Sequence, residues 1–342
     1  MKGNRYIFGT LLAGALLVSF SSCEEKLDPE SIFNTESANL DPYSASYQLD
    51  KFCEDNYLKN YNIQFRYKMQ DVGADMDYNL VPASYEKSID LAVLTKYLWF
   101  DVYDKVVSAD FLKLYGPRII HLIGSPAYNP ASGTMILGLA EGGLKVSLFR
   151  VNDMDPSSFE DLNEFYFKTM HHEFAHILHQ TKSYPREFDQ LSTAYYDPMN
   201  WGERNLDVCA SLGFTSDYAS SEAREDFAET IANYITKTDE QWATLLANAE
   251  LGWVERYDKD GIPVTDPLTR KPICDPGEDT DGVDGKAVIL QKVEIARQWF
   301  KDAWNMDLDA LRAEVQVRQL NYNLEELRKQ VLDIPKGADA QN

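Results

Sequence analysis

Hydrophobic and polar positions predict a mixture of strands and helices in the first half of the chain and mostly helices after it. Residues 61–68 alternate apolar and polar side chains, which is typical of a strand with one buried face. Residues 84–115 carry apolar side chains at helical spacing and contain no Gly or Pro, so they predict one or two helices that end before Pro117. A short β-branched run at 118–123 predicts another strand.

The next segments predict a hairpin and a long helix. Residues 134–139 and 144–151 are expected to pair around Gly142 and Gly143. Residues 157–180 contain no Gly or Pro, and a serine before two acidic residues marks a helix start there.

The rest of the chain predicts mostly helices. Ser220 or Ser221 is expected to cap a helix that runs to Tyr234. Residues 258–285 are rich in Pro, Gly and Asp and predict a loop, after which helices are expected at about 286–303 and 307–332.

The long helix at 157–180 contains a metal-binding pattern. His172 and His176 flank Glu173 in the sequence His-Glu-Phe-Ala-His, which places two imidazoles one turn apart on one face, where both can bind one metal ion. Glu173 is then positioned to take a proton from an attacking water. Two stripes on the helix support this interpretation, an apolar one and a histidine one. They contain Met170, Phe174, Ile177 and Leu178 on one side, and His172, His176 and His179 on the other.

A catalytic zinc needs a third protein ligand, and two candidates exist. His179 shares the histidine stripe, but a straight helix makes it hard for three imidazoles to meet one tetrahedral ion, so we expect His179 to lie beside the ligands. Metzincins solve this with a glycine where this chain has His179 and a final histidine where it has Lys182, so that family is excluded. The other candidate is Glu225, with Glu229 one turn later: one carboxylate to bind zinc and one to hydrogen-bond a ligand histidine. The alternative for these two is a solvated acidic helix face.

Composition narrows the function classes. The chain has 342 residues and a net charge of −22, from 33 Lys+Arg against 55 Asp+Glu, so binding to nucleic acid or to an anionic membrane through a basic surface is excluded. With 44% hydrophobic residues it can bury a sizeable core.

The N-terminus predicts a lipoprotein signal. Lys2 and Arg5 precede an apolar run at 6–18, and small residues lead to Cys23, which resembles the lipobox of bacterial lipoproteins. We therefore expect residues 1–22 to be a signal peptide, Cys23 to be lipidated and residues 23–45 to be a tether. An ordinary signal peptide followed by an unrelated cysteine is the alternative. The other three cysteines allow at most one disulfide.

The combined motifs resemble a family of zinc enzymes. The His172–His176 motif, a gap of 225 − 176 = 49 residues to Glu225, and Tyr218 seven residues before it are similar to gluzincin metallopeptidases of the lethal-factor and Pro-Pro endopeptidase type. This resemblance implies an α+β, zincin-like fold in which His172, His176 and Glu225 bind Zn²⁺. It also implies that Glu173 is the general base and that Tyr218 donates to the developing oxyanion.

The whole chain, with its lipobox, is similar to the substrate import-associated zinc metallohydrolase lipoproteins. That resemblance implies an outer-membrane lipoprotein that accompanies a TonB-dependent import complex and acts on a peptide or protein substrate. The acidic residues after Cys23 resemble a surface-export signal, so we expect the cell-surface side, with the periplasmic face as the alternative.

The predicted organisation is an N-terminal mixed α/β subdomain at 46–180, which includes the active-site helix, and a helical C-terminal subdomain at 181–342. The strand Leu144–Phe149 is the expected edge strand, where an extended peptide can bind by strand addition. The predicted function is a zinc-dependent metallopeptidase. The alternative is a non-catalytic, zinc-containing lipoprotein that presents peptide or glycan to an import system. Glu173 favours the enzyme, because a binding protein has no need of an acid beside the metal.

Overall fold

The computed structural model describes residues 40–69, 80–128, 135, 136, 138–141, 144–278 and 282–341. The described residues from Pro42 onward form one compact unit. The predicted signal peptide, Cys23 and the tether as far as residue 39 lie outside the described residues. Among the helices that are described, none is both long and apolar enough to cross a bilayer.

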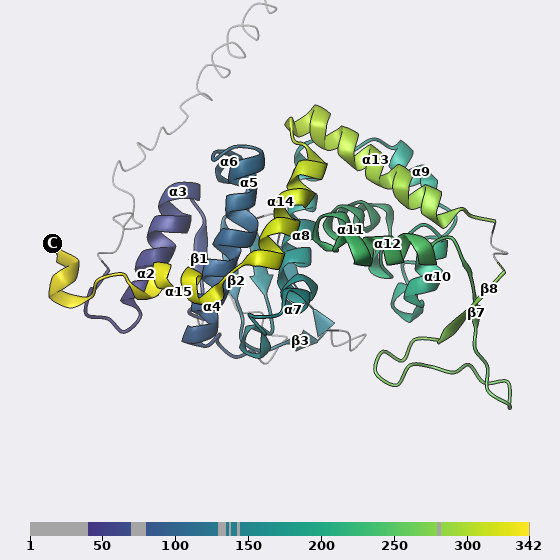
Figure 1. Cartoon of the computed structure of the whole chain (residues 1–342), viewed down its shortest axis with the longest axis horizontal. Coiled ribbons are helices and arrows are strands. Elements are labelled where there is room, and N and C mark those ends of the chain that lie inside the picture. The colour runs from purple at the N-terminus through teal and green to yellow at the C-terminus, as the bar shows by residue number, and fades with distance from the viewer. Residues whose placement is uncertain are drawn as a thin grey trace, which may run out of the picture. The chain divides into compact units, whose positions relative to one another are not determined.

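The unit has a mixed α and β architecture (Figure 1). Its α-helices are α2 (Tyr47–Cys53), α3 (Lys59–Tyr61), α4 (Tyr85–Thr95), α5 (Asp101–Val106), α6 (Phe111–Tyr115), α7 (Phe159–Leu162), α8 (Lys168–Thr181), α9 (Glu187–Leu191), α10 (Leu206–Ser211), α11 (Ala223–Thr236), α12 (Asp239–Asn248), α13 (Gly285–Trp304), α14 (Leu308–Asn321) and α15 (Leu324–Leu332). Its π-helical segments are η1 (Glu54–Leu58), η2 (Lys96–Phe100) and η4 (Asn163–Phe167), and its 3-10 turns are η3 (Val151–Asp153), η5 (Trp201–Glu203), η6 (Tyr218–Ser220) and η7 (Gly337–Gln341). Its strands are β1 (Gln64–Arg66), β2 (Ile119–Leu122), β3 (Ala127–Tyr128), β4 (Met135–Ile136), β5 (Gly138–Glu141), β6 (Lys145–Leu148), β7 (Gly252–Glu255) and β8 (Cys274–Gly277).

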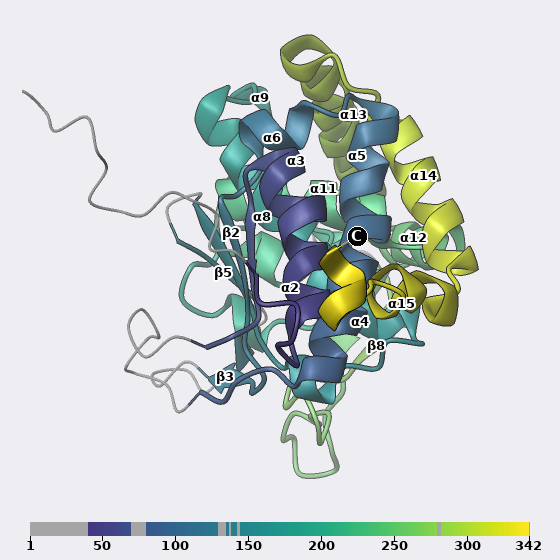
Figure 2. The ribbon, with the colours of Figure 1, turned by 90° about the vertical axis from the view of Figure 1, so that its left-hand side faces the viewer.

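A four-stranded sheet in the order β1-β2-β6-β5 lies beside the N-terminal helices (Figure 2). Strands β1, β2 and β6 are parallel to one another, and β5 is antiparallel to β6. The prediction that Leu144–Phe149 is an edge strand is therefore wrong. Strand β6 is paired on both sides, and β5 forms the edge next to it.

The predicted hairpin is present, with a different first strand. Strand β5 pairs with β6, whereas β4 pairs with β3 in a separate two-stranded sheet. The segment predicted as one strand at 134–139 thus contributes to two sheets. Gly142 and Gly143, which were expected at the turn, lie outside the described residues.

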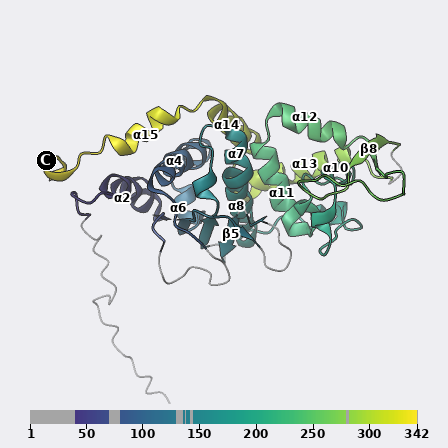
Figure 3. The ribbon, with the colours of Figure 1, turned by 90° about the horizontal axis from the view of Figure 1, so that it is seen from below.

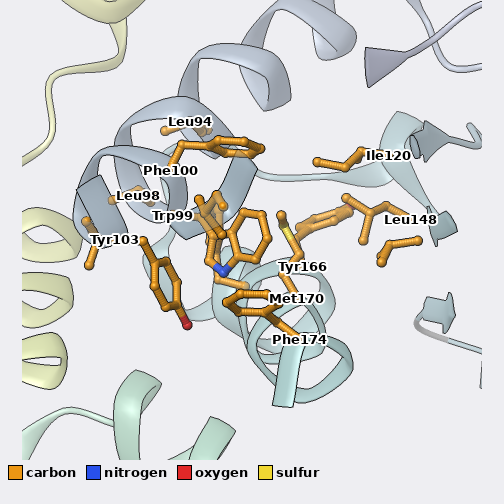
Figure 4. Close-up of a cluster of buried hydrophobic side chains, with 14 of the residues drawn as sticks. Leu94, Leu98, Trp99, Phe100, Tyr103, Ile120, Leu148, Tyr166, Met170 and Phe174 are labelled. Carbon is orange, nitrogen blue, oxygen red and sulfur yellow. The ribbon is translucent and has the colours of Figure 1, made fainter. Parts of the chain in front are cut away.

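The main core brings together side chains of the sheet, of α4 with η2, and of α8. Trp99 and Phe100 of η2 face Met170 and Phe174 of α8 and, on the sheet, Ile120 (Figure 4). The rings of Trp99 and Phe174 make an edge-to-face contact with centroids 5.4 Å apart. The apolar stripe predicted for the helix at 157–180 is therefore its core side.

Three of the described helices after residue 181, α9, α13 and α14, pack against α11. Helices α13 and α14 lie against α11, and α15 returns to the N-terminal part, beside α2 and α4 (Figure 3). The predicted helix at 307–332 is two helices, because Tyr322 is extended and the Asn323 side chain accepts the backbone N–H of Glu326 to start α15.

The predicted loop at 258–285 forms part of an arm. Strands β7 and β8 pair as an antiparallel ladder, and the chain between them extends from the end of the unit that holds α10 (Figure 1). Cys53, Cys209 and Cys274 are all free thiols. The division of the chain at residues 180 and 181 stays a prediction.

Candidate metal centre

Helix α8 continues a longer helical run that starts at Phe159. The Ser158 hydroxyl accepts the backbone N–H of Asp161 at 3.1 Å, as predicted for the start of this helix. The π-helical segment η4 links α7 to α8 without a break. With Met170 and Phe174 buried in the core, the opposite side of α8 carries His172 and His176 toward α11.

Helix α11 lies along α8 and supplies acidic side chains. It begins after Glu222, one residue later than the predicted serine caps, because the hydroxyls of Ser220 and Ser221 donate to backbone carbonyls of the preceding η6 turn. Phe227 of α11 is fully buried and stacks on Tyr184 with centroids 4.0 Å apart. This packing fixes which face of α11 is turned toward α8.

Three side-chain atoms converge between the two helices. His172 Nε2 and His176 Nε2 are 3.0 Å apart, and each lies 3.1 Å from Glu225 Oε2. Zinc–ligand distances of about 2.0–2.1 Å in a tetrahedron put neighbouring ligand atoms roughly 3.3 Å apart. Two imidazole nitrogens and one carboxylate oxygen are also a ligand set that zinc prefers. The cluster therefore fits a zinc ion, and within the described residues it is the one group of metal-ligand type.

The second nitrogen of each histidine also faces a partner. His172 Nδ1 lies 2.9 Å from Glu229 Oε1, and His176 Nδ1 lies 2.8 Å from His179 Nε2. Such partners fix the ring orientation of a ligand histidine and leave Nε2 for the metal. His179 is buried beside His176 and turns its Nε2 toward that ring, away from the converging Nε2 and Oε2 atoms.

Glu229 is held by three further donors. Its Oε2 lies 2.5 Å from Ser216 Oγ, 3.2 Å from Asn233 Nδ2 and 3.4 Å from Lys168 Nζ. The Glu229 side chain is 3% exposed, so neither it nor Glu225 belongs to a solvated acidic face. Burial alone raises the pKa of a carboxyl group, but Lys168 and the hydrogen bonds hold the pKa of Glu229 below its ordinary value.

The same carboxylates set the charge at the cluster. Burial lowers the pKa of His172, yet contacts with Glu225 and Glu229 outweigh burial and raise that pKa to about 10. Burial would raise the pKa of Glu225, but the two histidines hold it well below its ordinary range. The site thus has a negative potential that favours a bound cation.

Glu173 and Tyr218 lie around this cluster. Burial raises the pKa of the half-buried Glu173, while His172 and His176 oppose that shift. Tyr218 comes from the η6 turn, and its ring centroid is 5.8 Å from that of His172. Burial and the nearby Glu225 carboxylate raise the pKa of Tyr218 above its ordinary value, so its hydroxyl stays protonated and can donate.

Sequence reasoning missed Lys168, Ser216 and Asn233. Lys168 stands one turn before His172 on α8, a spacing that places it on the histidine face and was a usable signal. Ser216 comes from a loop, and nothing in its local sequence indicates that its hydroxyl meets a side chain 13 residues later.

The chain is similar to proteins that are described as zinc-binding metallopeptidases. A family model described as "Putative zinc-binding metallo-peptidase" matches residues 43–309, which include His172, His176 and Glu225. The crystal structure of "a putative zinc-binding metallo-peptidase from Bacteroides caccae ATCC 43185" is similar with 36% sequence identity and a TM-score of 0.64, over 82% of this chain and 93% of that chain. No curated protein matches the chain.

Proposed function

The chain belongs to the zinc-binding metallopeptidase family whose model it matches, and from this premise we propose that it is a peptidase of the gluzincin type with a zincin-like fold. In this proposal His172, His176 and Glu225 hold zinc. The observation that carries it is the convergence of their three ligand atoms at 3.0–3.1 Å. When bound, zinc supplies Lewis acidity, which polarises a carbonyl group and makes water easier to deprotonate.

The proposed proton transfers use Glu173. Its carboxylate takes a proton from the attacking water and passes it to the leaving amine. Burial raises the pKa of Glu173 toward the range in which a carboxylate is a better base. Glu173 stands between the two histidines in the sequence of α8, and both of them affect its pKa electrostatically.

The proposed stabilisation of the oxyanion uses Tyr218. Its hydroxyl donates to the oxygen of the polarised carbonyl as negative charge develops there. A raised pKa supports this role, because a deprotonated phenol has no hydrogen to donate. Glu229 and His179 hold the outer nitrogens of the two ligand histidines in place.

We propose that an extended peptide binds along β5. This strand is one of the two edges of the four-stranded sheet, and it also contacts α8. An edge strand offers unpaired backbone groups, with which a substrate backbone can pair before its carbonyl reaches the cluster.

The test is hydrolysis of a peptide library by the purified protein without residues 1–22. We expect zinc-dependent cleavage that EDTA removes, that Glu225→Ala abolishes together with zinc binding, and that Glu173→Gln lowers by at least ~100-fold while zinc stays bound. Equal cleavage by wild type and Glu173→Gln would contradict the catalytic assignment. Zinc binding without cleavage by either protein would favour the non-catalytic lipoprotein that presents peptide or glycan.

We also propose that lipidated Cys23 anchors the protein in the outer membrane, at the cell surface, beside a TonB-dependent import complex. The support is the sequence before and after Cys23. Incorporation of a labelled fatty acid that Cys23→Ala loses tests the anchor, and protease treatment of intact cells tests the exposed side. Protection from protease in intact cells would place the protein on the periplasmic face.

A further inference from the structure

Ser216 connects two parts of the proposed site that come from different segments. Its hydroxyl donates to Glu229 Oε2 at 2.5 Å, and its Oγ accepts the backbone N–H of Ala219 at 3.1 Å. Glu229 belongs to α11 and faces His172, whereas Ala219 belongs to the η6 turn that carries Tyr218. The Ser216 hydroxyl therefore bonds both to the Glu229 carboxylate, which contacts His172, and to the η6 turn, which carries Tyr218.

Besides the Ser216 bond, the η6 turn packs directly against α11, and the Tyr218 hydroxyl interacts with the Glu225 carboxylate of that helix. The backbone of the turn is closed by local bonds, in which the Asp217 carboxylate accepts the N–H of Tyr218 at 2.8 Å and the Ser221 hydroxyl donates to the carbonyl of Tyr218 at 2.7 Å. Asp217 also forms an ion pair with Lys271 of the arm between β7 and β8. These contacts shape the turn, but none of them reaches Glu229.

The Glu229 carboxylate has other donors, and their geometry differs from that of Ser216. Asn233 Nδ2 is 3.2 Å and Lys168 Nζ 3.4 Å from the same Oε2 atom, both longer than the 2.5 Å to Ser216. Because these two donors remain when Ser216 is removed, the carboxylate keeps hydrogen-bonded and charged partners. Its rotation, however, is no longer limited by the short bond.

We propose that Ser216 is a positioning residue that fixes the Glu229 carboxylate and the Tyr218 turn relative to each other. Through Glu229 it sets the orientation of His172, and through Ala219 it sets where the Tyr218 hydroxyl lies. The inference rests on the proposed function for the roles of zinc and Tyr218. It adds that the Ser216 hydroxyl holds both the carboxylate that orients the ligand His172 and the turn that carries Tyr218.

The experiment compares Ser216→Ala with Ser221→Ala. Both are made in the protein that lacks residues 1–22 and carries the Cys23→Ser substitution. Both changes remove one buried or half-buried serine hydroxyl bonded to the same turn, but only Ser216 reaches Glu229. Zinc affinity is measured by competition with a chromophoric chelator, and kcat and KM are measured on a cleaved peptide. We expect Ser216→Ala to weaken zinc binding by ~10-fold and to lower kcat by ~10-fold with KM within ~2-fold, at the lower end of the range for partners of metal ligands. Ser221→Ala should change each quantity by less than ~2-fold.

Two further variants keep the inference falsifiable if Ser216→Ala is poorly folded. Ser216→Thr keeps a hydroxyl and should retain zinc affinity. In a double-mutant cycle, Ser216→Ala added to Glu229→Gln should cause little further loss of zinc affinity, since both changes break one chain of contacts. Additive losses, an effect of Ser221→Ala as large as that of Ser216→Ala, or a fall in kcat with zinc affinity unchanged would each overturn the proposal.

The zinc measurement separates this inference from the proposed function. If wild type cleaves no peptide, the peptidase proposal fails, but the effect of Ser216→Ala on zinc affinity still tests the connection to Glu229. Amide hydrogen exchange at Ala219 then tests the other contact. We expect faster exchange in Ser216→Ala and no change in Ser221→Ala, because only Ser216 accepts that N–H. Unchanged exchange in Ser216→Ala would overturn the link to the turn.

Discussion

Two acidic side chains of helix α11, Asp226 and Glu229, each form an ion pair with a lysine of another helix, and the two pairs differ in their surroundings. Asp226 pairs with Lys292 of α13 at 2.6 Å, and both side chains are 0% exposed. Glu229, three residues later, pairs with Lys168 of α8 at 3.4 Å, and the Lys168 side chain is 21% exposed. The first pair is fully buried, and the second contacts His172 of the candidate metal centre through Glu229.

The partners of each pair show what it does. Lys292 Nζ also donates to the carbonyl of Gly213 at 2.7 Å and lies 4.3 Å from the Phe214 ring centroid, while Asp226 accepts the hydroxyl of Tyr196 at 2.8 Å. These contacts join α11 and α13 to two further segments, at Tyr196 and at Gly213–Phe214, without touching a candidate ligand. Glu229 instead contacts His172. We infer that the Asp226 pair determines how the helices pack, and that the Glu229 pair holds the candidate ligand His172 in its orientation.

The largest expected effect comes from Lys292→Met. Removing the ammonium group leaves the Asp226 carboxylate buried without its cation, which costs about 3–5 kcal/mol of unfolding free energy. The measurement is denaturant unfolding with EDTA present. The double variant Lys292→Met/Asp226→Asn should recover most of the loss, because no uncompensated charge remains. A ~10-fold loss of zinc affinity in folded Lys292→Met would contradict the inference that the Asp226–Lys292 pair acts only on helix packing.

A buried group with no charged partner sharpens the comparison. His171 lies next to His172 but turns into the core, where its Nδ1 is 3.0 Å from the Tyr103 hydroxyl. Burial lowers its pKa to about 3. The unfolded chain therefore binds a proton near pH 6.5 that the folded chain excludes, so stability is fully present above pH 6.5 and falls as the pH drops toward 3.

The size of this effect follows from the two pKa values. Between pH 8 and pH 5 wild type should lose about 2 kcal/mol of unfolding free energy through His171. His171→Gln lacks this titration and should lose that much less over the same range. Denaturant unfolding of both proteins at the two pH values, with EDTA present, gives the difference. Parallel losses in both proteins would show that His171 becomes protonated in the folded state.

The smallest effect is expected from Lys168→Met. Because the Lys168 side chain is partly exposed, water can replace part of its interaction with Glu229, and we expect zinc binding to weaken by only ~5-fold, about 1 kcal/mol. The difference from wild type should shrink as sodium chloride is raised. Lys237→Met is the matched control, since Lys237 lies close enough to Glu229 to affect it electrostatically but forms no ion pair with it in the described part of the chain. Equal losses in the two variants would assign the effect to general charge instead of contact.

Local patterns were the part of the structure that sequence predicted well. Ser158 caps the helix that leads into α8, and the two stripes on that helix lie as their spacing predicts, with Met170 and Phe174 buried in the core. A helix repeats every 3.6 residues whatever it packs against, so His172 and His176 share a face by geometry alone. Where local rules compete, prediction was less accurate: the serines expected to cap α11 bond to η6 carbonyls instead.

The sequence by itself determined that this chain has a histidine pair one turn apart, a glutamate between them and two carboxylates one turn apart elsewhere. Only the tertiary structure decided that Glu225 lies 3.1 Å from both histidines, that β5 and not β6 is an edge of the sheet, and that Ser216 joins Glu229 to the turn under Tyr218. The physical reason is the range of the interactions. Periodicity and capping act within a few residues, whereas strand order and contacts between helices depend on how apolar faces from distant segments bury one another.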